Sequence, residues 1–229
     1  MKKIKRLVKV SINLILLPFR IRVIRIMRLI EKDKRIPFDY IRFATLRLMA
    51  AEIEERKLTG DVAELGVWRG DFAKHINMLF PNRKLYLFDT FEGFDSRDVS
   101  IDISSSYSDG TQNFANTSVN LVLNKMPYPA QCEIIKGYFP DSLSDLPLQE
   151  TLRFCFVSID VDLYKPIYEG LCYFYPKLCK GGYILLHDYN EFTYKGVKAA
   201  VHQFAKENAI SYVPIPDESG SVVIAKPLT

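Results

Sequence analysis

Two nearly continuous apolar runs constrain the fold of this chain more than any other feature. They are "RFCFVSID" (residues 153–160) and "GYILLHD" (residues 182–188), and the helix-length segment "KPIYEGLCYFYPKLC" (residues 165–179) lies between them. Strands that are buried on both faces have this composition, and a connection of a dozen or more residues joins neighbouring parallel strands. We predict a helix with Pro166 in its first turn and Gly181-Gly182 at its end. The pattern therefore predicts a parallel sheet covered on both faces.

The rest of the chain continues this alternation of strand and helix. Residues 38–58 predict a helix that Asp39 caps, and further strands are predicted in "DVAELG", "KLYLFD", "CEIIKG", "AISYVPIP" and "SGSVVIAK". The last two strands are joined by a tight turn at Glu218–Gly220. With 229 residues and 48% hydrophobic composition, the chain can bury a full core. We predict one α/β domain over residues 37–229, a doubly wound, Rossmann-like sheet of seven strands that is mostly parallel with an antiparallel last strand, plus N-terminal helices.

The first 36 residues are predicted to be a separate basic segment. Residues 1–35 hold twelve Lys or Arg and two acidic residues, whereas the whole chain has a net charge of only +4. The longest apolar run there is about half of the ~20 residues that a membrane-spanning helix needs. The pattern predicts a basic amphipathic helix that contacts the inner face of a membrane, and packing within a homo-oligomer is the alternative. No nucleic-acid-binding module is apparent.

The four cysteines indicate the cellular compartment. Cys132, Cys155, Cys172 and Cys179 show neither CxxC spacing nor a disulfide-dense pattern, and no cleavable signal is apparent. We therefore expect reduced thiols in a cytoplasmic protein.

The stretch "ELGVWRGD" places an acidic residue and two glycines at the end of a predicted strand. Glu64, Gly66 and Gly70 form an ExGxxxG pattern, in which the main chain can approach a ligand that side chains would obstruct. Asp89 ends the next strand, where its carboxylate can accept hydrogen bonds from ribose hydroxyls. Neither the GxGxxG of dinucleotide folds nor the GxxxxGK of phosphate loops is present. A purely structural turn is the alternative for the glycines.

Five motifs carry a family resemblance. "GDVAELGVWRGD", "LYLFDTFEGF", "GYFPDSL", "SIDVDLYKPIYEGL" and "GGYILLHDY" follow one another in the order found in class I S-adenosylmethionine-dependent methyltransferases, and most closely resemble the macrocin-type sugar O-methyltransferase family. The resemblance implies S-adenosylmethionine as cofactor. Phe72 departs from the pattern, because a small hydroxyl residue often helps to hold the cofactor carboxylate there. The implied cofactor contacts are Glu64, Gly66, Val67 and Gly70 around the methionine moiety, Asp89 at the ribose, Phe139 and Asp141 at the adenine, and Asp160.

Polar residues at two neighbouring strand ends predict the catalytic centre. Asp160 and His187-Asp188 can converge on a divalent cation, Mg²⁺ or Mn²⁺, that binds vicinal sugar hydroxyls and favours ionisation of one of them. Asp160 and His187 are the predicted catalytic residues, with His187 either a metal ligand or the general base. A helix-capping Asp160 and a structural His187 are the alternatives. We interpret Asp162 as the cap of the following helix.

The acceptor is predicted from the segment "DSRDVSIDISSSYSDGTQNFANTS" (residues 95–118). Its length and polarity indicate either a lid over the acceptor site or a disordered loop. Tyr107, Phe114 and Tyr164 are candidates to stack on a sugar ring. We predict an O-methyltransferase that acts on a sugar hydroxyl of a glycan or glycosylated metabolite. A catechol or phenol O-methyltransferase and a non-catalytic cofactor-binding partner subunit are the alternatives.

Overall fold

The computed structural model describes residues 39–146 and 149–228. These residues belong to one compact unit that begins at Asp39. The predicted basic segment, with its amphipathic helix and its membrane contact, lies outside the described residues. Among the described residues, every helix is too short or too polar to cross a membrane.

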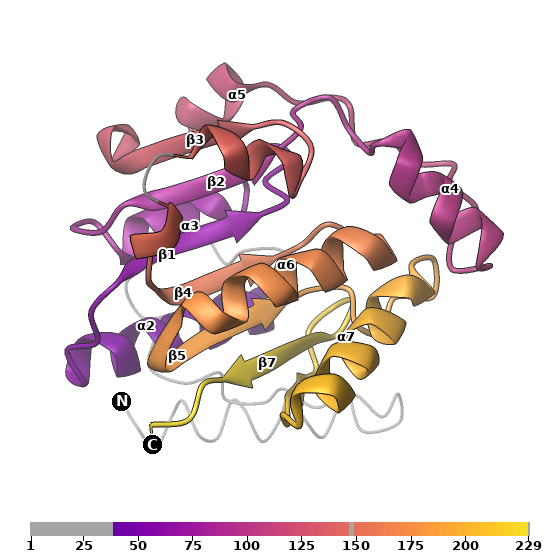
Figure 1. Cartoon of the computed structure of the whole chain (residues 1–229). Helices are drawn as coiled ribbons and strands as arrows, with labels where there is room; N and C mark the ends of the chain where they lie inside the picture. The colour runs from indigo at the N-terminus through magenta and orange to yellow at the C-terminus, as the bar shows by residue number, and fades with distance from the viewer. Residues whose placement is uncertain (1–38, 147–148, 229) are drawn as a thin grey trace, which may run out of the picture. The chain divides into compact units, whose positions relative to one another are not determined.

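Helices and strands alternate along the chain, as Figure 1 shows. The strands are β1 (Asp61–Leu65), β2 (Leu85–Asp89), β3 (Cys132–Lys136), β4 (Phe154–Ile159), β5 (Leu178–Leu186), β6 (Val213–Ile215) and β7 (Ser221–Ala225). The α-helices are α2 (Tyr40–Glu55), α3 (Ala73–Leu79), α4 (Ser96–Ser104), α5 (Val119–Leu123), α6 (Tyr164–Lys177) and α7 (Lys195–Asn208). Three 3₁₀ turns complete the described part: η3 (Pro129–Gln131), η4 (Asp141–Asp145) and η5 (Gln149–Thr151).

The described residues form a seven-stranded sheet in the order β3-β2-β1-β4-β5-β7-β6. All pairs from β3 to β5 are parallel, and β7 is antiparallel to both of its neighbours. This arrangement confirms the predicted doubly wound sheet with an antiparallel last strand. The strand order reverses between β1 and β4, and ligands of such sheets bind beyond the carboxyl ends of the strands at this point.

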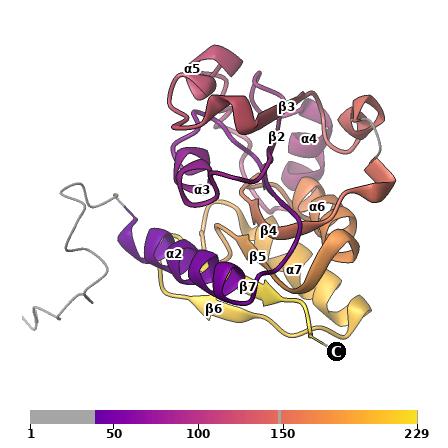
Figure 2. The ribbon, with the colours of Figure 1, turned by 90° about the vertical axis from the view of Figure 1, so that its left-hand side faces the viewer.

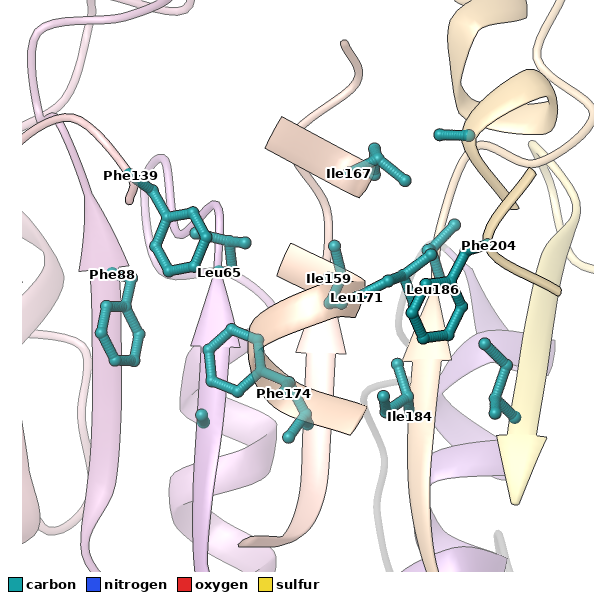
Figure 3. Close-up of a cluster of buried hydrophobic side chains, with 14 of the residues drawn as sticks. Leu65, Phe88, Phe139, Ile159, Ile167, Leu171, Phe174, Ile184, Leu186 and Phe204 are labelled. Atoms are coloured by element: carbon teal, nitrogen blue, oxygen red, sulfur yellow. The ribbon is translucent and has the colours of Figure 1, made fainter. Parts of the chain in front are cut away.

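Two layers of helices cover the sheet, and each layer has its own core. Figure 2 shows α2 and α3 on one side of the strands and α6 and α7 on the other. Side chains of one strand alternate between the two cores, so that Val157 faces α6 and α7 while Phe156 faces α2 and α3. Leu171 and Phe174 of α6 fill the first core, together with Phe204 of α7 (Figure 3). Both faces are therefore buried, as the continuous apolar runs predict.

The end of α6 differs from the prediction. The helix ends at Lys177 and β5 begins at the next residue, so that Gly181-Gly182 lie inside the strand. The pairing of β4 with β5 shifts here, because Phe154 is opposite Leu178 whereas Phe156 is opposite Tyr183. Gly181 accommodates this irregularity with a φ of +81°. The two glycines therefore belong to a bulge and not to a helix end.

Residues 95–118 contain a helix of their own. Asp95 caps α4 by accepting a hydrogen bond from the Arg97 amide at 2.9 Å. The buried Asp102 side chain then accepts a hydrogen bond from the Tyr164 amide at the start of α6, at 3.0 Å. Figure 1 shows α4 on the side of the sheet toward which the arrows of β1 and β4 point. The structure therefore orders this segment and places its helix near the carboxyl ends of the strands.

Candidate functional site

The turn after β1 lies directly against the end of β4. Gly66 has a φ of +86°, and a Cβ atom on it would lie 1.9 Å from the Asp160 carbonyl oxygen. The Asp160 amide donates a hydrogen bond to the Leu65 carbonyl at 2.8 Å, which fixes the two strand ends to each other. Only glycine fits at position 66, since any side chain would meet the main chain of the neighbouring strand. This close approach brings the β1 turn and Asp160 into one site.

Asp89 holds the same turn from the end of β2. One of its carboxylate oxygens accepts hydrogen bonds from the amides of Val67 at 2.7 Å and Trp68 at 2.8 Å. The other oxygen accepts one from the Phe91 amide at 2.6 Å. A carboxylate has about four acceptor positions, so these contacts leave capacity for a ligand hydroxyl. The ribose contact of Asp89 stays a prediction, and its contact with the turn is an additional role.

Glu64 is a buried acid with an unpartnered oxygen. Its side chain is 1% exposed, and Oε2 has no hydrogen-bond partner among the described residues. Burial raises the pKa of this carboxyl well above its usual range, although the charge of Arg42 acts in the opposite direction. A buried acceptor without a donor is costly, which makes Glu64 a candidate for contact with a cationic or hydrogen-bond-donating ligand group.

The predicted adenine contacts lie in two different environments. The Phe139 ring is inside the core, edge-on to Phe88 and stacked on Phe174, so only its main chain remains for a ligand (Figure 3). The Asp141 carboxylate is on the surface, 3.1 Å from Arg97. Sequence analysis missed Ser142, whose buried hydroxyl has no hydrogen-bond partner among the described residues. Its position in the "GYFPDSL" motif was the only available signal.

The predicted metal-binding residues come together beyond β4 and β5. His187 Nδ1 lies 3.0 Å from Asp188 Oδ1 and 3.4 Å from Asp160 Oδ1. One donor atom from each of the three residues lies within 4.8 Å of the other two, which is close enough for a single ion. Carboxylate and imidazole donors together suit Mn²⁺ and similar transition metals better than Mg²⁺. The three side chains therefore fit a divalent cation.

His187 is surrounded by carboxylates. Burial alone would lower the pKa of its imidazole, but the charge of Asp160 and the nearby carboxylates of Asp160, Asp188 and Asp39 raise it to about 12. The opposite effect keeps the pKa of Asp160 well below its usual range: Arg42 and His187 outweigh the cost of its burial. These surroundings therefore favour the protonated, positively charged imidazole. It must lose that proton before it can ligate a metal or act as a base.

Asp162 belongs to this site, and the prediction that it caps α6 is wrong. Leu163 is the N-cap residue of α6, and the Tyr164 amide is bonded to Asp102 instead. Asp162 adopts a φ of +59°, and its carboxyl is close enough to Asp188 and Asp160 for their charges to act on it. Burial raises the pKa of the Asp162 carboxyl well above its usual range, and the charges of Asp188 and Asp160 raise it further.

Sequence analysis also missed Arg42 of α2. Its guanidinium is buried, lies 2.9 Å from Asp160 Oδ2 through Nη2, and stacks at 3.9 Å over the Phe72 ring. The Asp39 cap of α2 is confirmed, since its Oδ1 accepts a hydrogen bond from the Arg42 amide at 3.1 Å. A basic residue on the apolar face of a helix was the only signal in the sequence.

The aromatic residues that are predicted to stack on the acceptor sugar are in contact with other aromatic rings. The Phe114 ring is edge-on to Trp68 at 5.5 Å and to Phe94 at 5.1 Å, and the Tyr107 ring lies 5.3 Å from that of Tyr164. Trp68 Nε1 donates a hydrogen bond to Asn116 at 2.7 Å, which ties the 95–118 segment to the β1 turn. The segment is ordered, and its action as a lid stays a prediction.

Comparison with known proteins identifies the family that this chain matches. The sequence model of the Macrocin-O-methyltransferase (TylF) family matches residues 39–217. Mycinamicin III 3''-O-methyltransferase of Micromonospora griseorubida is 26% identical over 165 residues, covering 66% of this chain and 63% of the relative. The 8-demethyl-8-(2,3-dimethoxy-alpha-L-rhamnosyl)-tetracenomycin-C 4'-O-methyltransferase of Streptomyces olivaceus is 26% identical over 175 residues, covering 72% and 64%. The chain therefore spans slightly less than two thirds of these relatives.

A solved structure has the same fold. The O-methyltransferase NovP superposes with a TM-score of 0.63 at 20% sequence identity, covering 82% of this chain and 80% of NovP.

Proposed function

Because the chain belongs to the macrocin-O-methyltransferase (TylF) family, we propose that it is an S-adenosylmethionine-dependent O-methyltransferase acting on a sugar hydroxyl of a glycan or glycosylated metabolite. The observation that supports this most strongly is the meeting of the Gly66 turn, Asp89 and Asp160 at the point where the strand order reverses. Ligands of such sheets bind at this point, beyond the carboxyl ends of the strands, and the polar cluster of Asp160, His187 and Asp188 follows β4 and β5 at the same edge. The sugar acceptor is inferred from a relative whose name includes a rhamnosyl group.

The chemistry needs a positioned hydroxyl and a destination for its proton. When bound, S-adenosylmethionine supplies an electrophilic methyl group, and transfer breaks one carbon–sulfur bond as one carbon–oxygen bond forms. Asp160, His187 and Asp188 lie where they can orient the acceptor oxygen and stabilise its developing negative charge. Aromatic rings at Tyr107 and Tyr164 offer a face for the sugar ring.

We further propose that a divalent cation assists this reaction. Asp160, His187 and Asp188 would hold it, and the ion would favour ionisation of the acceptor hydroxyl. If His187 is a ligand, activity should be greater with Mn²⁺ than with Mg²⁺, and His187→Asp should shift the preference to Mg²⁺ with activity retained. If His187 is a base instead, the same substitution should lower turnover on the order of 10²-fold with either ion. Full activity of a chelator-treated protein that contains no metal by elemental analysis would contradict the cation proposal.

The function is tested by supplying the protein with S-adenosylmethionine and candidate acceptors. Mass spectrometry should detect a product heavier by one methylene on a sugar, and glycans or metabolites of cells that lack the gene should have lost that increment. Asp160→Asn should abolish the product, because it removes a charged group from the centre of the site. A variant in the remote, exposed pair Arg56–Glu52, Arg56→Met, is the matched control and should retain activity. Methylation of a phenol but of no sugar would favour the catechol-type alternative.

For the basic N-terminal segment, we propose contact with the inner face of a membrane. Residues 1–35 carry twelve basic and two acidic residues, and each Lys or Arg near an anionic surface contributes about 1 kcal/mol at low salt. Removal of residues 1–36 should abolish binding to vesicles with anionic lipid and leave activity on a soluble acceptor unchanged. A change of oligomeric state by light scattering, with no vesicle binding by either form, would support subunit packing instead.

A further inference from the structure

Exposed apolar side chains border the candidate site. Phe192 is 88% exposed, Ile41 is 41% exposed and Trp68 is 38% exposed. Phe192 follows Asp188 by four residues, Ile41 follows Asp39 by two, and Trp68 belongs to the turn after β1. Single apolar residues on a surface are ordinary, but several of them around one polar site indicate a surface that something apolar covers.

Hydrogen bonds hold the turn that carries Phe192. The Glu191 amide donates to the Asp188 carbonyl at 3.1 Å. The Glu191 carboxylate accepts hydrogen bonds from the Thr193 amide at 3.2 Å and from the Ser219 hydroxyl at 3.3 Å. A ring that a fixed turn keeps exposed loses little conformational freedom when a partner covers it. The exposure of Phe192 is therefore a property of the fold.

Contacts continue from this turn to the start of α2. Two residues before Ser219, a carboxylate oxygen of Asp217 lies within 4.8 Å of donor atoms of Asp39 and His187. Asp39 Oδ2 is 3.9 Å from His187 Nε2, and Asp39 is the N-cap residue of α2. Ile41, in the first turn of α2, therefore borders the same polar cluster as the exposed phenylalanine.

Aromatic rings connect Trp68 to the same turn. The ring of Trp68 is 5.5 Å from that of Phe114, which is 5.1 Å from that of Phe94. Phe94 in turn is 6.2 Å from Tyr194, two residues after Phe192. Printed contacts thus link the three exposed apolar side chains around the polar cluster of β4 and β5. We call these three side chains the apolar rim: Ile41, Trp68 and Phe192.

The charge of the chain indicates what covers the apolar rim. Residues 1–35 hold twelve basic and two acidic residues, and the described domain begins at Asp39, beside His187. The basic segment therefore joins the domain at the edge of the site. A bilayer with anionic lipid matches both features, because its surface is negatively charged and its interior is apolar. The charged residues next to Phe192 in sequence and in the neighbouring turn have both signs: Glu191, Lys195, Lys198 and Glu218.

We propose that the apolar rim docks on a membrane that contains anionic lipid, and that a lipid of this membrane carries the sugar acceptor. The inference rests on the proposed function, since it names the class of acceptor and the surface that reaches it. Residues 1–35 supply the attraction to the membrane, and the rim sets the orientation of the domain. With the rim in the interface, the polar cluster inside it opens toward the headgroups, where a lipid-linked glycan is already held nearby.

The first experiment tests whether the rim enters the bilayer. The full chain would be mixed with vesicles of phosphatidylcholine and phosphatidylglycerol, with and without bromine in the acyl chains. Bromine quenches tryptophan fluorescence on close contact, and Trp68 is the single tryptophan of the chain. We expect the brominated vesicles to quench Trp68, and vesicles without phosphatidylglycerol to bind much less of the protein.

A pair of matched variants tests the contribution of one rim residue. Phe192→Ser should weaken binding to the anionic vesicles about 10-fold, because a phenyl ring no longer leaves water on docking. Leu228→Ser is the control. Leu228 is 63% exposed and lies at the opposite end of β5, near Gly181, so its substitution should leave vesicle binding unchanged.

Three outcomes would overturn the docking of the rim. The first is vesicle binding without quenching of Trp68 and without an effect of Phe192→Ser, since residues 1–36 would then bind lipid alone. The second is no vesicle binding by the full chain. The third is self-association by light scattering that Phe192→Ser abolishes, with no vesicle binding, because the rim would then be an interface between two copies. If thermal unfolding shows that the variant does not fold, the quenching of Trp68 in the unmodified protein decides.

The second experiment tests the class of acceptor. Membranes and soluble extract of the cells that make the protein would be incubated with it and with S-adenosylmethionine labelled in the methyl group. Label on glycans that extract with lipid would support the inference. Label on water-soluble glycans alone would overturn the lipid-linked acceptor and leave the proposed function standing. No label in either fraction, together with no binding of S-adenosylmethionine by calorimetry, would contradict the proposed function and the acceptor class with it, whereas the vesicle experiment decides the docking independently.

Discussion

The buried carboxyl of Asp102 predicts how the stability of the protein changes with pH. Its carboxylate is fully buried where α4 meets α6, Oδ1 accepts a hydrogen bond from the Tyr164 amide, and Oδ2 has no hydrogen-bond partner among the described residues. Burial raises the pKa of this carboxyl from 3.8 to about 6; the bond from Tyr164 lowers it in part, and the charge of Asp98 raises it. In Asp102→Asn the amide oxygen can keep the bond to Tyr164, and the ionisable group is lost.

Proton linkage determines whether the Asp102 carboxyl makes folding more or less favourable as the pH rises. Between pH 4 and pH 6 the folded protein holds this proton more tightly than the unfolded chain does, so Asp102 makes folding less favourable as the pH rises. The full effect is about 3 kcal/mol, since a pKa difference of one corresponds to about 1.4 kcal/mol. About half of it, roughly 1.4 kcal/mol, falls between pH 5 and pH 8. The stability of Asp102→Asn relative to the unmodified protein should therefore increase by that amount over this range.

Urea unfolding at several pH values measures this difference directly, and its change with pH is independent of any constant cost of the new amide. Asp109→Asn in the same segment is the control. The Asp109 carboxylate is exposed, and hydrogen bonds from Thr111 lower its pKa, so it stays ionised in the folded and unfolded states above pH 5 and its substitution should give no change with pH from pH 5 to pH 8. A stability difference for Asp102→Asn that stays constant from pH 5 to pH 8 would refute the reasoning.

Three further substitutions test the turn, the acid behind it and the core. Gly66→Ala should yield no folded protein by circular dichroism, because its Cβ atom would lie 1.9 Å from the Asp160 carbonyl oxygen. Asp89→Ala should leave three amides without their acceptor, weakening S-adenosylhomocysteine binding by calorimetry and destabilising the fold by about 1–3 kcal/mol or more; unchanged binding would exclude Asp89 from the site. Leu171→Ala should cost about 2–5 kcal/mol of unfolding free energy in urea, since the side chain is fully buried in the core of α6 and α7.

The sheet could be predicted from the sequence because its signals are local. The apolar run of β4 and that of β5 report burial on both faces, and the Asp39 cap and the final hairpin each depend on a few adjacent residues. The end of α6 could not be predicted in this way. Gly181-Gly182 have the same appearance in a helix end and in a bulge, and only the pairing of β4 with β5 distinguishes the two.

The site residues that could be predicted from the sequence are those that directly follow a strand. Asp160, His187 and Asp188 follow strands that are neighbours in the sheet, so topology alone brings them together. Arg42 reaches the site from a helix far away in the sequence, and no local pattern specifies its contact with Asp160. The error at Asp162 has the same origin, because the bond that replaces its expected cap comes from Asp102, sixty residues earlier.

The chain contains a single tryptophan, and the fold places it at an informative position. Trp68 joins the β1 turn to the 95–118 segment, with its amide bonded to Asp89 and its indole to Asn116. The residue is 38% exposed, and its ring lies edge-on to Phe114. The intrinsic fluorescence of the protein therefore comes from one known place. A change in its emission on ligand binding reports a change in the surroundings of this junction without any added label.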